Sequence, residues 1–315
     1  MSELNLVTGG AGFIGCHLVE HLLKLGRKVR VLDDFSTGLR DNLAPFRGQV
    51  EVVEGSLTDA KTVERAVDGA KVIFHLGALA SVARSVENPL ASHAACATGT
   101  LHVLDAARRF GSRRVVFAAS SSAYGGADGE GGQQESLMPA AKSPYAAAKL
   151  AGEFYMQAFA ATYGLETVRL RFFNIFGPRQ RADSPYSGVI ALFIAHMSSR
   201  KAPSVHGDGL QSRDFTYVAN AVQALVKASE APAERVSGNV YNVGTGRSVT
   251  ILDLIRELNV ILGTNHAAIH GANRLGDVRF SKADISRTRR DLGYDPNVTF
   301  EDGLRKTVEW YREQR

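Results

Sequence analysis

Six short apolar runs follow one another through the first half of the chain, and amphipathic segments separate most of them. The runs are LNLVT, KVRVLD, VEVVEG, KVIFHL, RVVFAAS and TVRLRFF. Their length and composition are typical of buried strands, whereas HLVEHLLKLG, TDAKTVERAVDG and TGTLHVLDAARRFG have the apolar spacing of helices. Strands and helices that alternate in this way build parallel sheets, so the sequence predicts an α/β protein with a doubly wound parallel sheet.

A glycine-rich turn, TGGAGFIG, directly follows the first run. Gly9, Gly12 and Gly15 are spaced three apart and open the first predicted helix. Glycines at such a turn let the backbone approach a diphosphate, which then sits at the positive N-terminus of the helix. A strand before the turn and a helix after it are the context of a Rossmann dinucleotide site, although a glycine pattern alone can be a simple turn.

Asp33 closes the second run. A carboxylate at this position accepts hydrogen bonds from the adenosine ribose and repels a 2′-phosphate, so NAD is favoured over NADP. Ser36, Thr37 and Gly38 follow as further candidate contacts.

After about Asn174 the pattern becomes irregular. Helices are predicted around residues 188–200, 217–229 and 250–262. VYNVG at 240–244 has the composition of one more strand that returns to the sheet. We therefore expect an NAD-binding Rossmann domain over residues 1–173 plus about 215–246. A smaller α/β substrate domain would occupy 174–315, interrupted by that return.

Composition excludes several classes of protein. The 37 basic and 32 acidic residues of the 315-residue chain are interspersed, and SRTRRDLG is typical of a solvated helix face, so we expect no nucleic-acid partner. No apolar run approaches the ~20 residues that span a bilayer, so we expect no membrane segment. The N-terminus enters a strand almost at once and leaves no room for a signal peptide, which makes a cytoplasmic location the default expectation. Cys16 and Cys96 are too few for a disulfide framework.

His17, Glu20 and His21 match the inverted zinc-protease pattern H-x-x-E-H. Their helix begins at the glycine turn already assigned to a phosphate, and no distant glutamate stands out as a third ligand. We therefore expect surface histidines and no metal site.

The segment SPYAAAKLAGE has the start of a helix, with Ser143 at the N-cap and Pro144 in the first turn. Tyr145 and Lys149 then lie four residues apart on one face. An ammonium beside a phenol favours the phenolate, so the pair predicts a tyrosine whose pKa is lowered and which acts as a base. The alternative is a chance pair on a helix surface.

Three hydroxyls, Ser120, Ser121 and Ser122, come at the end of the fifth run in SSSAYGG. Parallel sheets bind ligands at the carboxyl ends of their strands, although a hydrophilic strand exit would look the same. With TGGAGFIG, SPYAAAK and RFFNIFGPRQ in this order, the chain resembles the extended short-chain dehydrogenase/reductase superfamily over nearly its whole length. Within it, the chain is most similar to the UDP-sugar 4-epimerases, especially those of UDP-N-acetylglucosamine and UDP-glucose.

The resemblance implies that Tyr145 is the catalytic base and that Lys149 binds the nicotinamide ribose. Lys149 and the positive nicotinamide ring would together lower the pKa of Tyr145. Ser120 would hydrogen-bond the 4-hydroxyl of the sugar, while Ser121 and Ser122 stand where the sugar-nucleotide dehydratases carry an acidic pair. NAD would take the hydride from C4 and return it to the other face of a 4-keto sugar without being consumed.

The cofactor site implied by the resemblance extends beyond the glycine turn and Asp33. It adds Phe13, Ile14, Asp34, Ser56, Leu57, Leu76, Gly77, Ala78 and Phe172, together with Tyr145 and Lys149. Three positions depart from the family. Ser56 stands where aspartate is usual, Cys96 where asparagine is common, and Ala80 where the galactose epimerases have lysine.

The implied substrate site is built from the second half of the chain. It consists of Asn174, Arg213 and Arg274 at the diphosphate, Asp277 at the uridine ribose, Val189 and His206 along the uridine, and Ser81 near the sugar. Arginine forks bind phosphate oxygens in pairs, but either arginine taken alone could belong to a surface ion pair.

Ser281 lies four residues after Asp277 in GDVRFSKADIS. In the 4-epimerases a tyrosine at this position excludes an N-acetyl group and a small residue admits it. The resemblance therefore implies activity on both UDP-hexoses and UDP-N-acetylhexosamines. Ser281 could also cap a helix beginning at KADISRTRRDL, and both roles can hold.

Two alternatives stay open. One is epimerisation of UDP-glucuronate or a UDP-pentose, although the uronate epimerases carry a basic residue in the loop matching SPYSGVIALF, which is neutral here after Arg181. The other is a non-catalytic NAD-binding sensor or scaffold on the same fold. The resemblance also implies a homodimer, in which the helix at about 88–110 and the helix of Tyr145 form a four-helix bundle with their symmetry mates.

Overall fold

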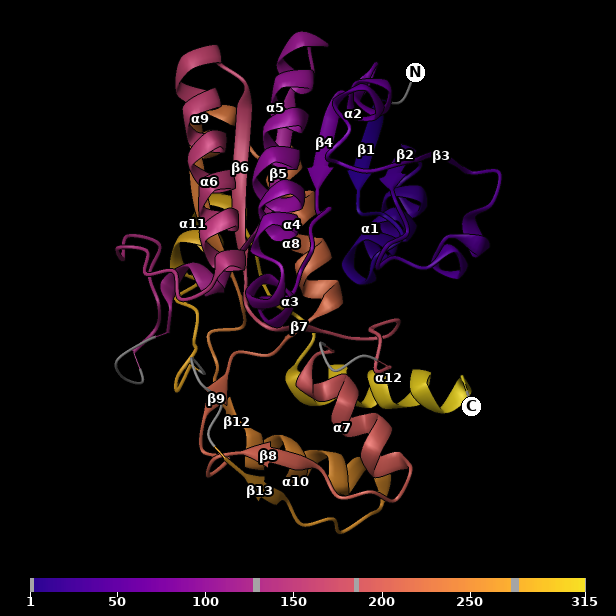
Figure 1. Cartoon of the computed structure of the whole chain (residues 1–315), viewed down its shortest axis with the longest axis vertical. Helices are drawn as coiled ribbons and strands as arrows, with labels where there is room; N and C mark the ends of the chain where they lie inside the picture. The colour runs from indigo at the N-terminus through magenta and orange to yellow at the C-terminus, as the bar shows by residue number, and fades with distance from the viewer. Residues whose placement is uncertain (1–2, 127–130, 184–186, 273–277, 315) are drawn as a thin grey trace.

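The computed structural model describes residues 3–126, 131–183, 187–272 and 278–314. Within these residues, seven parallel strands form one sheet in the order β11-β6-β5-β4-β1-β2-β3 (Figure 1). The strands are β1 Leu4–Thr8, β2 Lys28–Asp33, β3 Val50–Glu54, β4 Val72–His75, β5 Arg114–Ser120, β6 Glu166–Phe172 and β11 Asn239–Val243. β2 and β4 flank β1, with Thr8 opposite both Leu32 and His75. The doubly wound parallel sheet is confirmed, and β11 is the predicted returning strand.

Helices cover both faces of the sheet. One face carries α2 (Ala60–Val67), α5 (Gly99–Arg109) and α6 (Pro144–Tyr163), and the other carries α1 (Phe13–Lys24) and α8 (Val218–Glu230). Successive strand residues point to opposite faces, so Leu6 packs in one core and Val7 in the other. Burial on both faces explains why most of these strands are apolar throughout.

β3 is the exception to the predicted burial of the strands. It pairs with β2 at one edge of the sheet, and its side chains are partly or fully exposed, with Val52 at 44%. The prediction of a buried strand from VEVVEG was wrong, because an edge position depends on strand order and the local sequence does not contain that order.

The helix predicted at about 88–110 is divided. α4 (Pro89–His93) follows α3 (Val82–Glu87), and a π-helical turn over Ala94–Thr98 separates α4 from α5. In this turn the carbonyl oxygen of Cys96 accepts a hydrogen bond of 2.6 Å from the Thr100 hydroxyl. A π turn interrupts the regular helical ladder and redirects side chains. Here it places Cys96 in one apolar cluster with Ala148 and Tyr145 of α6.

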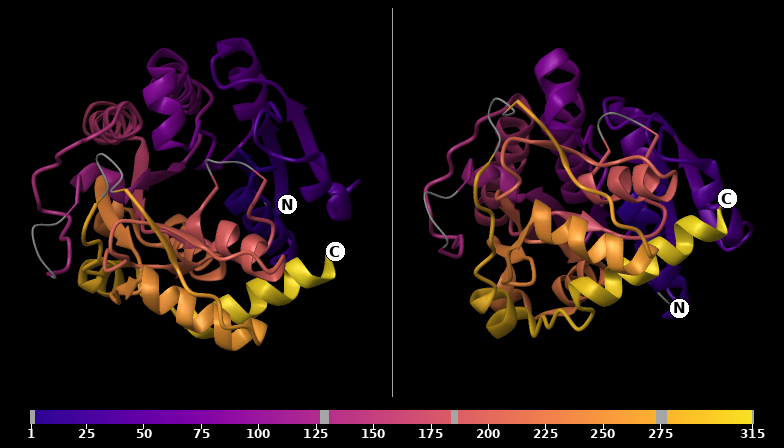
Figure 2. Two further views of the ribbon diagram at one scale, coloured as in Figure 1. Left: turned by 60° about the horizontal axis from the view of Figure 1, so that its bottom comes forward. Right: turned by 90° about the horizontal axis from the view of Figure 1, so that it is seen from below.

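Much of the second half of the chain forms a smaller unit beyond the carboxyl ends of the strands, while β6, α8 and β11 belong to the sheet and its covering helices (Figures 1 and 2). Its main helices are α7 (Val189–Ser198), α10 (Ile251–Leu262) and α12 (Phe300–Glu313). Phe215 stacks on Phe300 with ring centres 5.7 Å apart, and Phe176 meets Phe300 edge-on at 5.8 Å, in the core between these helices. The three helices predicted after Asn174 are thus confirmed as α7, α8 and α10, while the domain boundaries stay a prediction.

Short elements complete the described part of the chain. Three two-stranded pairs are β7 (Ile175–Phe176) with β10 (Thr216–Tyr217), β9 (Ser212–Arg213) with β12 (Val249–Thr250), and β8 (Ser204–His206) with β13 (Ile269–Gly271). The short helices are η1 (Arg40–Asn42), η2 (Ala44–Phe46), η4 (Ser121–Tyr124), α9 (Ala233–Val236) and α11 (Ser286–Leu292). Across the residues described, no helix has the length and apolar character needed to cross a membrane.

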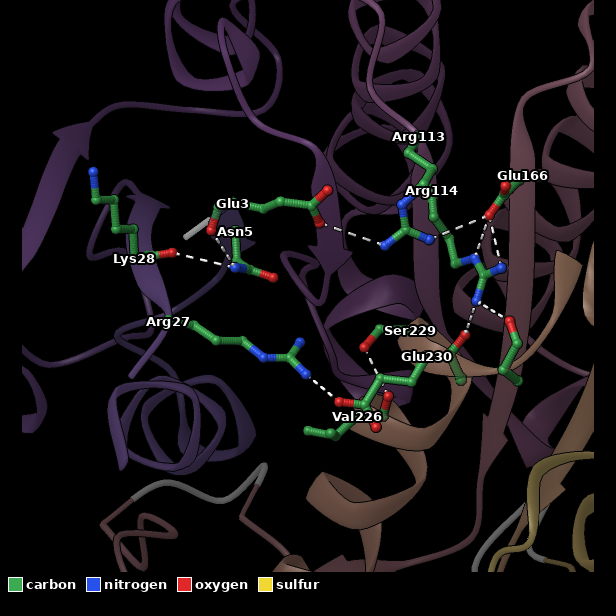
Figure 3. Close-up of polar contacts among 12 residues, drawn as sticks. Glu3, Asn5, Arg27, Lys28, Arg113, Arg114, Glu166, Val226, Ser229 and Glu230 are labelled. Atoms are coloured by element: carbon green, nitrogen blue, oxygen red, sulfur yellow. Dashed lines mark hydrogen bonds and ion pairs between the residues drawn. The ribbon is translucent and has the colours of Figure 1, made fainter. Parts of the chain in front are cut away.

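A network of charged side chains lies at the amino ends of the strands (Figure 3). Arg114 on β5 is 2% exposed, and its guanidinium lies 2.7 Å from the Glu166 carboxylate on β6. It also donates to the carbonyl oxygens of Ala228 and Ala231 at the C-terminal end of α8, where the helix dipole favours a cation. These contacts fix α8 to the sheet at the end away from the glycine turn.

Candidate active site

The glycine turn joins β1 to α1 at the carboxyl end of the sheet. Gly9 has a φ of +69°, which residues with side chains rarely adopt, and Gly12 is an N-cap that offers the first turn no side-chain acceptor. A Cβ atom on Gly15 would collide with the carbonyl oxygen of Gly9 and lie 2.8 Å from the Cα of Gly10. Uncapped N–H groups therefore face a cradle that only glycine leaves open, and this arrangement fits a diphosphate.

Asp33 holds this turn in place. Its carboxylate accepts hydrogen bonds from the backbone N–H groups of Ala11 at 2.8 Å and of Phe35 at 2.9 Å. Burial raises the pKa of Asp33, and the two N–H groups oppose that shift. Each carboxylate oxygen can accept a second hydrogen bond, so the predicted contact with an adenosine ribose is compatible with this role.

A cavity of about 570 Å³ runs from the glycine turn past the end of β5 to the segment that follows β6. The predicted cofactor residues in its lining are Gly9, Gly12, Phe13, Ile14, Gly15, Asp33, Asp34, Ser36, Thr37, Ser56, Leu57, Leu76, Gly77, Ala78, Tyr145, Lys149 and Phe172. Gly38 is not part of the lining, and a Cβ there would lie 2.9 Å from Ala11 and from Asp33. The predicted substrate residues in the lining are Ser81, Ser120, Tyr145 and Asn174.

Ser120, Tyr145 and Lys149 line this cavity together. Ser143 caps α6 by accepting the N–H of Ala146 at 3.1 Å, which sets the first two turns that carry Tyr145 and Lys149. Ser120 Oγ accepts hydrogen bonds from the backbone N–H and the hydroxyl of Ser122, at 3.2 and 2.8 Å. The hydroxyl hydrogen of Ser120 is then available to donate, and Ser120 lowers the pKa of the Tyr145 phenol beside it.

The electrostatics of Tyr145 differ from the prediction. Burial, and to a smaller extent Cys96, raise the pKa of its phenol, and Ser120 opposes the shift. Lys149 directs its ammonium to the carbonyl oxygen of Ala118 at 2.9 Å, over the ring of Phe117. The predicted lowering of the pKa by Lys149 is therefore wrong for this arrangement. Helical spacing placed both residues on one face, but desolvation outweighs a charge that is turned toward the backbone.

Lys149 is a buried cation, 3% exposed. Burial lowers the pKa of its ammonium, and Cys96 and Glu153 oppose the shift. Glu153, one helical turn further along α6, forms a buried ion pair with Arg171 on β6 at 2.8 Å. The carboxylate thus lies where it partly compensates two buried cations.

Ser121 and Ser122 lie in η4, outside the lining of the cavity. Ser122 is a hydrogen-bond donor to Ser120, as described above, and so acts on the site through its neighbour. Ser81, in contrast, lines the cavity and caps α3 by accepting the N–H of Arg84 at 3.2 Å.

Several predicted substrate residues lie beyond this lining. They are Val189 at the start of α7, His206 at the exposed end of β8, Arg213 on β9 and Ser281, which is 5% exposed. Arg213 donates to the carbonyl oxygen of Ser212 at 2.8 Å. Arg274 and Asp277 lie outside the described residues.

The predicted capping role of Ser281 is wrong. α11 begins at Ser286 with Ile285 at its N-cap, so Ser281 precedes the helix by a full turn. Ala283 instead forms a parallel β-bridge with Gln133, which keeps the segment extended. The first residues of KADISRTRRDL therefore do not continue the helix that their pattern predicts, because this tertiary contact holds them extended.

Sequence reasoning missed six polar residues in the lining. They are Asn42, Arg84, Arg179, Gln180, Arg181 and Ser187. Arg179 has a φ of +64° and pairs with Glu20 of α1 at 3.0 Å, which draws the segment after β6 over the first helix. RFFNIFGPRQ contains two of these six residues, Arg179 and Gln180, but an arginine in a loop gives no signal that separates a cavity wall from a surface ion pair.

His17 and Glu20 of the H-x-x-E-H pattern take part in this same contact between α1 and the segment after β6. His17 is half-buried, and its Nε2 is hydrogen-bonded to the carbonyl oxygen of Pro178 at 2.9 Å, while Glu20 pairs with Lys24 and Arg179. The prediction of surface histidines is correct for His21 and wrong for His17, because the loop at Pro178 folds over the helix. In the part of the chain that the structure describes, no group of three or more His, Cys, Asp or Glu side chains could hold a metal.

The glycine cradle, the carboxylate at the end of β2 and the cavity at the carboxyl ends of a doubly wound sheet define a dinucleotide-binding enzyme fold. The NAD dependent epimerase/dehydratase family matches residues 5–244, and the chain belongs to this family. This confirms the predicted family, and the cofactor is NAD.

The chain is 36% identical to the UDP-glucose 4-epimerase of Mycolicibacterium smegmatis over 98% of both chains. It is also 36% identical to the UDP-N-acetylglucosamine 4-epimerase of Methanobrevibacter ruminantium in complex with UDP-N-acetylmuramic acid, with a TM-score of 0.93 over 100% of both chains. The UDP-glucose 4-epimerase of Thermus thermophilus in complex with NAD is 33% identical, with a TM-score of 0.90 over 98% of this chain and 99% of that one. The relatives also include a nucleotide-sugar decarboxylase and a dehydratase.

Proposed function

We propose that the protein is an NAD-dependent nucleotide-sugar 4-epimerase, which acts on a UDP-hexose or a UDP-N-acetylhexosamine through a 4-keto intermediate. The observation that carries the proposal is the placement of Ser120 and Tyr145 together on the cavity wall, with Lys149 one turn along the same helix. The epimerases among the relatives support it.

Tyr145 is the group in this site that exchanges a proton with the 4-hydroxyl of the sugar. Ser120 lowers the pKa of the phenol and so favours the phenolate, which is the form that acts as a base. Lys149 keeps two ammonium hydrogens beyond the one bonded to Ala118, and these can contact ligand oxygens. Bound NAD⁺ supplies the hydride acceptor and its reduced form the hydride donor, so the reaction needs no external oxidant.

Ser121 and Ser122 favour epimerisation over dehydration. Elimination of water needs acid and base groups besides the tyrosine, and these two positions carry hydroxyls, one of which is engaged with Ser120.

Epimerisation of UDP-glucuronate or a UDP-pentose is the second candidate. Arg181 lines the cavity and is a cation that a sugar carboxylate could approach. Its guanidinium is held by Asp183 through two hydrogen bonds of 2.9 and 2.7 Å, so a uronate would have to compete with that carboxylate.

A panel of UDP-sugars tests the proposal. The purified protein is incubated without reductant with UDP-glucose, UDP-N-acetylglucosamine, UDP-glucuronate and UDP-xylose, and the products are separated. A C4 epimer from either of the first two supports the proposal, whereas an epimer only from the last two favours the second candidate. No epimer from any of them would contradict both and leave a non-catalytic NAD-binding sensor or scaffold.

We also propose that the protein is a homodimer whose interface includes α3 together with the helices of the predicted four-helix bundle, α4, α5 and α6. α3, α4 and α6 pack against one another and expose Val86, Leu90 and Phe154 to 66%, 81% and 61%. Large apolar side chains on neighbouring helices are typical of a surface that a partner covers.

A further inference from the structure

Asp214 is a fully buried carboxylate in the smaller unit, directly after Arg213. Its Oδ1 accepts hydrogen bonds from the N–H and the hydroxyl of Thr245, both at 2.8 Å, and a longer one of 3.4 Å from the Thr216 hydroxyl. Its Oδ2 accepts the backbone N–H groups of Gly246 at 3.0 Å and Ala283 at 3.1 Å. One carboxylate therefore joins three segments that are distant in sequence.

The hydrogen-bond pattern favours the ionised form of Asp214. Three of the five groups are backbone N–H groups, which can only donate, and they lie on both carboxylate oxygens. Burial raises the pKa of the carboxyl, and the N–H groups of Thr245, Ala283 and Gly246 oppose the shift. A carboxylate in place of a neutral group makes these hydrogen bonds stronger than ordinary backbone ones.

The segments around Asp214 carry or contact three of the candidate substrate residues. Arg213 is its neighbour on β9, and Ala283 lies two residues after Ser281. Thr216 donates its backbone N–H to the carbonyl oxygen of Asn174 at 3.2 Å, and Asn174 lines the cavity. The segments of Arg213 and Ser281 thus meet at the Asp214 side chain, and the Asn174 segment is joined to them through the backbone of Thr216.

The packing at this junction leaves little freedom. A Cβ atom on Gly244 would lie 2.7 Å from Oδ2 of Asp214 and 2.5 Å from the Cβ of Ala283. The Ser248 hydroxyl adds a second link, a hydrogen bond of 3.1 Å to the carbonyl oxygen of Ser281. A shift of any one segment would therefore disturb the others.

We propose that Asp214 is a positioning residue of the nucleotide-sugar site, which holds the segments of Asn174, Arg213 and Ser281 in one binding arrangement. This inference rests on the proposed function for the identity of the ligand. It assigns to Asp214 an effect on UDP-sugar binding rather than on the chemical step, because Asp214 reaches the site only through these segments and not through Ser120 or Tyr145.

The test is the variant Asp214→Asn, with UDP titrated by calorimetry and steady-state kinetics on the sugar identified by the panel. The amide has the same shape but turns an NH₂ group toward N–H or O–H donors, so the hydrogen bonds to one oxygen are lost. We expect UDP affinity to fall and KM to rise by about tenfold or more, with kcat within about threefold and NAD content unchanged. Unchanged UDP affinity and KM, with only a lower Tm, would overturn the proposal.

A milder pair of variants keeps the test decisive if Asp214→Asn does not fold. Thr245→Val removes one hydroxyl donor from the carboxylate and should weaken UDP binding in the same direction. Thr288→Val is the matched control, because its buried hydroxyl donates to the Asn242 carbonyl oxygen at 2.6 Å and does not touch Asp214. Equal UDP affinities in these two variants would contradict the proposal. A wild-type protein that binds UDP but turns over no sugar would refute the proposed reaction while leaving this titration valid.

Discussion

Tyr145 is the residue on which the proposed chemistry depends most. Tyr145→Phe removes the phenol oxygen but keeps the ring in its cluster with Cys96 and Ala148. We expect turnover to fall by about a thousandfold, within the range of lost acid–base catalysis, while NAD stays bound. Epimer formation and the NAD released on denaturation measure the two effects. Tyr155→Phe on the exposed face of the same helix is the control, and loss of NAD from Tyr145→Phe would show that the residue is misassigned.

Ser281 is predicted to decide which sugars fit. It is buried, so a tyrosine cannot occupy the space of the serine and must extend into neighbouring space. Ser281→Tyr should abolish turnover of UDP-N-acetylhexosamines by steric exclusion and largely spare the UDP-hexoses, as product ratios would show. Ser286→Tyr, at an exposed position, is the control. Equal loss of both activities, or a parent that never accepts N-acetylated sugars, would refute the assignment.

His75 is predicted to be a neutral residue with one defined tautomer. The Thr100 hydroxyl donates to Cys96, so Nε2–H of His75 must donate to Thr100 at 2.9 Å, and Nδ1 must accept from Thr8 at 2.8 Å. Burial, with a smaller effect of Lys149, lowers the pKa of His75 from 6.5 to about 3. Between pH 6.5 and about pH 3, His75 binds a proton in the unfolded chain but not in the folded one. The free energy of unfolding therefore falls as the pH decreases from 6.5, by up to ~1.4 kcal/mol per pH unit.

Urea unfolding between pH 4.5 and 6.5 checks this contribution. His75→Gln removes the titrating group, so the free energy of unfolding should depend less steeply on pH than in the wild type. His93→Gln, at an exposed position, should keep the wild-type slope. The same slope in all three proteins would mean that His75 is not the neutral buried group described here.

The residues of the site were predictable where backbone conformation dictates the sequence. Gly9 and Gly15 are required by the turn, and the spacing of Tyr145 and Lys149 follows from a helix that Ser143 caps. The pKa of Tyr145 was not predictable, because it depends on burial by segments far away in sequence. Arg179 escaped notice for the same reason, since only the folded chain brings it to Glu20 and the cavity wall.

The junction of β1 and α1 is the element that makes NAD binding possible. Gly15→Ala places a methyl group against the Gly9 carbonyl oxygen, which must move the turn away from the diphosphate. We expect the variant to be purified without NAD and to be inactive while its far-ultraviolet circular dichroism is retained. Gly131→Ala is the control, because a Cβ there meets open space. Full NAD content in Gly15→Ala would contradict the assignment of this turn as the binding site of the diphosphate.

The elements themselves were largely predictable, because strands buried on both faces leave continuous apolar runs. Five of the strands lie within a residue or two of their predicted ranges, namely β1, β2, β4, β5 and β6. The exposed edge of β3 and the π turn between α4 and α5 were not predictable. The first depends on strand order, which leaves no local pattern.

The assembly of the whole molecule follows from the surface that α3, α4 and α6 present. Val86, Leu90 and Phe154 are among its most exposed apolar side chains, and α6 also carries Tyr145 and Lys149 on another of its faces. A partner molecule that covers this surface would bury the apolar groups and restrain the catalytic helix at the same time. We therefore expect light scattering at micromolar concentration to give twice the mass of the chain.

Charge substitution on this surface should separate the two molecules. The double variant Leu90→Glu and Phe154→Glu places like charges where two symmetric copies meet, so we expect the mass of one chain and lower epimerase activity, because α6 loses its support. Val260→Glu is the matched control, since Val260 is 73% exposed but lies on α10 of the smaller unit, and this variant should keep the dimer mass. A monomeric wild type, or a double variant that stays dimeric, would show that this surface is not the interface. Because NAD is held mainly by the turn between β1 and α1, the monomeric variant should still contain its cofactor, which distinguishes a lost interface from a lost fold.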